Sequence, residues 1–183
     1  KDLHAAGKIK LTDSSLMEGR LSGGIESVLV ENKHITIKKG NLGADLGDVS
    51  FEGAIDLLEI HDRGKNNTAD FDLDLRSLKV PRIIEMLEKK NGPFEAGINR
   101  NIDAVINSKL KVTAGWSRSR ETTAGLDIKE MSLSGGGAGE IKLKGPLAIS
   151  GSKIDYDLDA GFLKANFAPI LNDQRYASDF NSS

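Results

Sequence analysis

The sequence predicts a mainly β protein arranged as an antiparallel meander, and three observations support this. Apolar and polar residues alternate along most of the chain, which is the period of half-buried strands. Glycine is frequent and proline rare, with 20 and 4 residues among 183, and glycine or asparagine groups recur every ten residues or so. A distinctive phrase, an aromatic residue followed by alternating Asp and Leu, occurs twice.

The repeated phrase is FDLDLRSLKV at residues 71–80 and YDLDAGFLKA at residues 156–165. A second shared phrase precedes each copy, GDVSFEG at residues 47–53 and GEIKLKG at residues 139–145. Self-similarity at a long period indicates a modular array, in which each unit leaves a face or an edge for its neighbour.

Two stretches of helical period accompany the repeats, and they suggest where each unit ends. Val80, Ile83, Ile84 and Leu87 share one helical face, so a helix is expected at about residues 81–90. The second helical segment is expected at about residues 163–173, where Pro169 leaves open whether the helix starts there or is kinked.

We therefore divide the chain into two similar β-units, residues 1–92 and residues 93–183, each with a short helix. Turns are expected at the glycine and asparagine groups Gly23-Gly24, Asn32-Lys33, Gly40-Asn41, Gly43, Gly115 and Gly135-Gly136-Gly137.

The parity of the strands identifies a candidate apolar surface. In both phrases the aromatic and aliphatic residues alternate with carboxylates, and residues 102–114 keep one apolar parity for about thirteen residues. A one-residue slip would reverse every side chain, so the shared parity predicts that both phrases face the same side of the sheet. We expect Phe71, Leu73 and Leu75 to occupy places equivalent to those of Tyr156, Leu158 and Ala160 in two superposable units. The candidate residues of this apolar face are Phe71, Leu73, Leu75, Ile106, Leu110, Tyr156 and Leu158.

Several chemistries find no support in the sequence. The net charge is −2 with no basic block, which argues against nucleic-acid binding. There is no cysteine, and the three histidines (His4, His34 and His61) are scattered, so we expect no metal, no cofactor and no catalytic site. The glycine run at residues 134–139 lacks the Lys-Ser/Thr of a phosphate loop and is interpreted as a turn.

The remaining distinctive side chains also have simple interpretations. The Asp-x-Asp pairs at residues 70–74 and 155–159 lack the glycine and glutamate of a calcium loop, and we interpret them as the solvent face of two strands. Trp116, the only tryptophan, is interpreted as a cap on the edge of a core.

The phrases resemble those of the AsmA-like family of bacterial envelope proteins, which includes TamB and YhdP. The resemblance lies in residues 47–57, in residues 71–87, in Pro93-Phe94-Glu95-Ala96-Gly97 and in residues 126–149. In that family an Asp/Leu strand leads into a short helix, followed by a Pro-apolar step and another strand.

The resemblance implies a curled, open β-groove in the periplasm and a role in outer-membrane biogenesis or phospholipid transport without catalysis. The resemblance implies a phospholipid or another envelope lipid as the partner, with envelope proteins as further partners. The chain begins at Lys1, within a strand pattern. We expect it to be a piece of a longer protein whose membrane anchor lies elsewhere.

An alternative interpretation explains the same alternation. A structural or adhesive domain, either a β-sandwich or a β-solenoid, would use the apolar parity to fill a closed core. The sequence leaves open whether the apolar face is an open groove or such a core.

Overall fold

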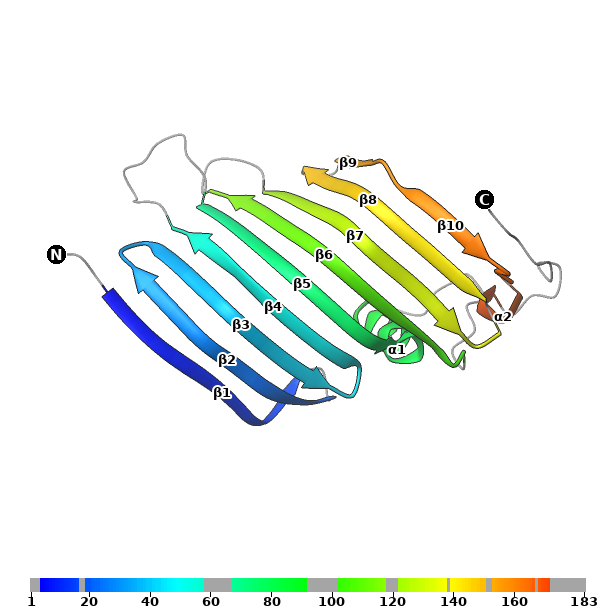
Figure 1. The fold of residues 1–183 in the computed structure, drawn as a ribbon, viewed down its shortest axis with the longest axis horizontal. Helices are drawn as coiled ribbons and strands as arrows, with labels where there is room; N and C mark the ends of the chain where they lie inside the picture. Colours follow the sequence, from blue (N-terminus) through cyan, green and yellow to red (C-terminus); the bar gives the residue numbers. More distant parts are fainter. Residues whose placement is uncertain are drawn as a thin grey trace.

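A computed structural model describes residues 4–16, 19–57, 67–91, 102–117, 122–137, 139–150, 153–166 and 168–171. These residues form one antiparallel sheet that curls without closing (Figure 1). The strands follow one another across the sheet in chain order, and each neighbouring pair is antiparallel. The predicted fold class, a mainly β antiparallel meander with an open concavity, is confirmed.

The strands of the first unit are β1 (His4–Leu16), β2 (Gly19–Glu31), β3 (His34–Ala44), β4 (Gly47–Asp56) and β5 (Asn67–Lys79), followed by helix α1 (Val80–Asn91). Those of the second are β6 (Ala104–Trp116), β7 (Thr123–Gly135), β8 (Glu140–Ser150), β9 (Lys153–Tyr156) and β10 (Asp159–Leu163), followed by α2 (Ala168–Leu171). Both β9 and β10 pair with β8, so they form one interrupted edge strand. The predicted boundary at residues 92–93 lies outside the described residues.

The two units share a β-bulge in the strand that precedes GDVSFEG in the first unit and GEIKLKG in the second. Ile37 of β3 pairs with Gly53 of β4, and Gly40 pairs with Phe51, so β3 has one more residue than β4 between these two pairs. Residues 128–131 of β7 stand in the same relation to Gly145 and Leu143 of β8. The bulges therefore occupy equivalent places relative to the repeated phrase.

A second shared feature shows that the Asp/Leu phrases are not in structural register. Gly47 and Gly139 both have positive φ, and a Cβ on either would lie within 2.8 Å of the carbonyl oxygen of Ser77 or Lys164, respectively. Ser77 and Lys164 also share an unusual positive φ, 51° and 49°. The sequence phrases align Ser77 with Phe162 instead, so the structural equivalence is displaced by two residues. A displacement of two keeps the parity of the side chains.

The two helices differ in how well the sequence predicts them. Helix α1 matches the expected 81–90 segment, and its Ile84 is buried. The second helix was expected from residue 163, but Leu163 still pairs with Glu140 in the sheet. The helix begins at Ala168, whose N–H donates to Asn166 Oδ1 at 3.0 Å, and Pro169 lies in its first turn. Residues 172 and 173 lie outside the described part of the chain.

The buried core of the described residues is small, and its hydrophobic cluster lies where α1 meets the sheet. Ile102 and Ala104 pack against Val80 and Leu133 at the end of the sheet contacted by α1. Most other apolar side chains of the sheet are only half-buried. No helix in these ranges is long and apolar enough to cross a membrane.

Several glycines expected in turns lie inside strands instead. Gly23 and Gly24 lie in β2, Gly40 and Gly43 in β3, and Gly115 in β6. By contrast, the turns at Asn32-Lys33 and at residues 136–137 are present as predicted. One of these glycines, Gly40, leaves room for an aromatic ring from the neighbouring strand.

Candidate functional site: the apolar face

Strand pairing places the apolar residues of the sheet in rows on one face. Residues directly opposite each other in an antiparallel pair have side chains on the same face, so the register can be followed from strand to strand. The central row is Ile9, Ile25, Gly40, Phe51, Leu73, Leu110, Ile128 and Gly145.

Rows of the same character flank the central row. On one side lie Gly7, Val28, Ile37, Gly53, Phe71, Val112, Leu126, Leu147 and Tyr156. On the other lie Leu11, Gly23, Leu42, Val49, Leu75, Ser108, Met131, Leu143 and Ala160. These three rows contain no charged residue, and the Ser108 hydroxyl donates to the Glu130 carbonyl at 2.9 Å.

All seven candidate residues lie on this apolar face. Phe71 and Tyr156 belong to one row, although they come from the two different phrases. Ile106 lies opposite Leu78 on β5, on the same face. Leu158 lies beside Gly145, because a Cβ on that glycine would approach the Leu158 Cα to 3.1 Å. The prediction that both phrases face one side is therefore confirmed.

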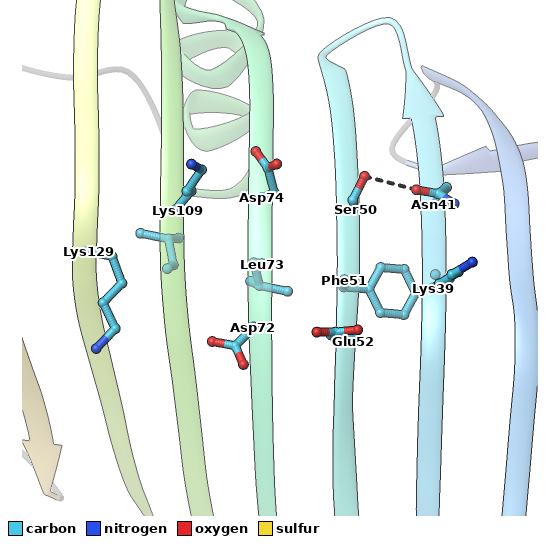
Figure 2. A pocket seen from close by; sticks show the side chains of 12 residues that line it. Lys39, Asn41, Ser50, Phe51, Glu52, Asp72, Leu73, Asp74, Lys109 and Lys129 are labelled. Carbon is cyan, nitrogen blue, oxygen red and sulfur yellow. Dashed lines mark hydrogen bonds between the residues drawn. The ribbon is translucent and has the colours of Figure 1, made fainter.

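A hollow of about 480 Å³ lies at the centre of the sheet, and Phe51, Leu73 and Leu110 contribute its apolar lining (Figure 2). Its rim is charged and includes Lys39, Glu52, Asp72, Asp74, Lys109 and Lys129. Figure 2 shows the Phe51 ring reaching from β4 across to β3. There it covers Gly40, where a Cβ would lie 2.2 Å from the ring. The glycine therefore lets the aromatic ring lie over the neighbouring strand. The volume is within the range of small-molecule sites.

Phe51 and Gly40 are not among the residues that the sequence predicts for this face. The signal available was weak, since Phe51 has the strand parity of Val49 and Gly40 resembles a turn residue. Their relation depends on the register between β3 and β4, where Gly40 lies opposite Phe51. The same arrangement occurs one strand further along, where Phe71 lies opposite Gly53.

Exposure of the apolar face increases toward the β9–β10 edge. Leu110, at the middle of the sheet, is 8% exposed, while Leu158 is 36% and Tyr156 is 73% exposed. Ile9, at the other edge, is 49% exposed. Within the ranges described, the sheet is a single layer and has no second sheet over its apolar face.

The opposite face is polar and carries the carboxylates of both Asp-x-Asp pairs. Asp70 forms an ion pair with Lys111 at 3.0 Å, which raises the pKa of that lysine. Hydrogen bonds from Arg76 lower the pKa of Asp74. These contacts support the interpretation of the carboxylates as a solvent face.

A metal site does not form among the residues that the structure describes. These residues contain no group of three His, Cys, Asp or Glu side chains suited to an ion. His34 instead contacts the carboxylate of Asp56 at 2.5 Å, and His61 lies outside the described ranges. Trp116, at the end of β6, has the parity of Ala114 and so lies on the apolar face, where it is half-buried.

Chemically, the three rows offer apolar contact over a long, continuous surface, and charged side chains border the central hollow. Such a surface suits a ligand that is itself long and apolar. Comparison with known proteins gives no further guidance, because no protein-family model, no curated protein and no solved structure matches the chain.

Proposed function

We propose that this chain is a non-catalytic module that holds or conducts the acyl chains of a phospholipid along its apolar face. The observation that supports the proposal most strongly is the set of uncharged rows running from β1 to β9 without a covering layer in the described residues. A soluble domain rarely leaves so large an apolar patch exposed unless a ligand or partner uses it.

The energetics favour passage of a lipid over tight capture. Each fully buried methylene contributes about 0.8 kcal/mol, so a chain of about fourteen carbons would recover roughly 10 kcal/mol if fully enclosed. An acyl chain on an open face is covered on one side only and recovers about half of that. This amount offsets extraction from a bilayer in part, which suits a surface that conducts lipid.

The proposed cellular setting follows from the resemblance to AsmA-like proteins. In that setting the chain is a periplasmic part of a longer, inner-membrane-anchored protein that acts in outer-membrane biogenesis or phospholipid transport. The strand-to-helix order of both units and the single open sheet support this assignment. The alternative of a sandwich or solenoid needs a second layer or a closed core, and the described residues form neither.

Photo-crosslinking tests the lipid proposal, because it captures short-lived contacts. The chain is mixed with vesicles of phosphatidylethanolamine and phosphatidylglycerol that contain a phospholipid with a diazirine in its acyl chain. After irradiation, mass spectrometry of peptides locates the adducts. We expect adducts at the half-buried Phe51 and Leu73, and few on the polar face of the same strands. Adducts distributed equally over both faces, or none on a folded chain, would contradict the proposal.

A further inference from the structure

One end of the strands is covered by the helices. Both α1 and α2 lie at this end, after β5 and β10 respectively (Figure 1). Val80 of α1 packs against the buried pair Ile102 and Ala104, and Ile84 of the same helix is 6% exposed. Ala104 belongs to the apolar face, because it has the parity of Ile106 on β6. Helix α1 therefore covers the apolar face at this end, which we call the helix end.

The apolar face also reaches the opposite end of the strands, which we call the open end and which includes Leu57, Trp116 and Ile149. The last full row before the open end is again free of charge, and it consists of Ala5, Val30, Ile35, Ile55, Ala69, Ala114, Ala124, Ile149 and Ile154. Beyond this row Leu57 continues the parity of Ile55, and Trp116 continues that of Ala114. No helix of the described residues lies at the open end.

Large apolar side chains are exposed at the open end on strands inside the sheet. Leu57 is 40% exposed and Ile149 is 39% exposed, although β4 and β8 each have a neighbouring strand on both sides. Their exposure therefore arises from their place at the end of the strands. The two residues lie four strands apart, which is about 19 Å at roughly 4.8 Å per strand. Trp116 lies between them on β6, half-buried on the same face.

The charges at the open end are balanced. Among the described residues Glu31 and Asp56 are acidic, and Lys33 and Lys153 are basic. The Asp56 carboxylate also contacts the His34 ring. A partner recognised by charge would need a surface of one sign, which this end does not offer. A lipid bilayer needs neither such a surface nor a fixed complementary shape, because its acyl region accepts any apolar side chain.

We propose that the open end docks on the surface of a lipid bilayer, with Leu57 and Ile149 inserted among the acyl chains. This inference rests on the proposed lipid function and adds the place at which acyl chains enter the apolar face. A chain that leaves the bilayer between these two residues meets Trp116 and then the uncharged rows. Its methylenes pass from one apolar environment to another and are not all exposed to water. Since α1 covers the helix end, the open end is the way in.

Flotation with vesicles of phosphatidylethanolamine and phosphatidylglycerol tests the docking on the whole chain. The wild-type chain should float with the vesicles, and added salt should leave the bound fraction unchanged, because the contact is apolar. The variant L57N/I149N removes the apolar contact without adding charge. It should bind the vesicles at least about tenfold more weakly than the wild type. Both positions are well exposed, so the variant should fold, and circular dichroism checks this.

A matched control makes a leucine-to-asparagine change at the helix end. Leu46 lies in the turn between β3 and β4, and its carbonyl accepts the N–H of Lys79, the residue before α1, at 2.8 Å. Leu46→Asn should float like the wild type, whereas Leu57→Asn alone should float less. A wild-type chain that does not float, or L57N/I149N that floats as well as the wild type, would overturn the proposal.

A soluble lipid separates this proposal from the proposed function. Crosslinking is repeated with a short-chain diazirine phospholipid below its critical micelle concentration, so that no bilayer is present. Adducts on the central row of L57N/I149N, at the wild-type level, together with its loss of flotation, would support docking at the open end. The same adducts on a wild-type chain that does not float would leave the lipid function standing and overturn the docking. A folded wild-type chain without adducts would overturn both.

Discussion

Replacing Leu73 with aspartate places a carboxylate within the central apolar row, in a hollow that Glu52, Asp72 and Asp74 already border. Leu73 is half-buried, opposite Phe51 and Leu110 in the central row. Full burial of a leucine contributes about 1.5–3 kcal/mol, so a half-buried one loses about 1 kcal/mol, and the new carboxylate keeps contact with water. We expect a total loss of about 1–2 kcal/mol in the free energy of unfolding, which a domain of ordinary stability tolerates.

Leu73→Asp should weaken lipid binding far more than it weakens folding. A carboxylate in contact with acyl chains costs about 2.5–3.5 kcal/mol on insertion scales, which corresponds to about 100-fold weaker binding. The assays are urea unfolding and displacement of a fluorescent fatty acid. Ser132→Asp adds the same charge to β7 on the polar face, opposite Lys142, and is the matched control. A loss of more than about 4 kcal/mol for Leu73→Asp would indicate a closed core and refute this reasoning.

Three further predictions concern the sheet and its helix. Gly40→Ala should cost about 1–3 kcal/mol by urea unfolding, because its Cβ would lie 2.2 Å from an aromatic ring. For Gly43→Ala the nearest atom is an oxygen of the flexible Asp48 carboxylate at 3.2 Å, so this variant should cost much less. Ile84→Ala, at a buried position of α1, should cost about 2–4 kcal/mol and leave the lipid crosslinks of the central row in place. Arg76→Gln should remove a stabilisation that is present above about pH 4 and is lost as the pH falls through the lowered pKa of Asp74. The free energy of unfolding of the variant should therefore fall less steeply in acid than that of the wild type. The same fall with pH in both proteins would refute this prediction.

The sequence predicted the faces of the sheet well, because parity is a local property. Aspartate alternates with apolar residues in both phrases, and successive side chains of a strand point to opposite faces. The carboxylates and the leucines must therefore lie on opposite sides of the sheet. The apolar assignment of Phe71, Leu73 and Tyr156 therefore needed no knowledge of which strand lay beside which.

Register and the role of the glycines were not predictable in the same way. Whether a glycine lies in a turn or within a strand depends on the residue opposite, and Gly40 is paired with Phe51 across a bulge that local sequence does not reveal. For the same reason, aligning the two phrases by sequence places equivalent residues two positions away from their structural equivalents. Ser77 corresponds structurally to Lys164 through contacts with Gly47 and Gly139, which are distant in sequence.

Fluorescence of Trp116 tests the central claim most directly, namely that the apolar face is open to acyl chains. Trp116 is the only tryptophan and lies on that face at the end of β6, so it reports on the apolar face without any labelling. Phospholipids brominated on their acyl chains quench tryptophan on contact. We predict saturable quenching by brominated lipid, none by the unbrominated lipid, and much weaker quenching in Leu73→Asp. Emission that brominated acyl chains leave unchanged, in a chain shown to be folded, would contradict an apolar face that accepts lipid.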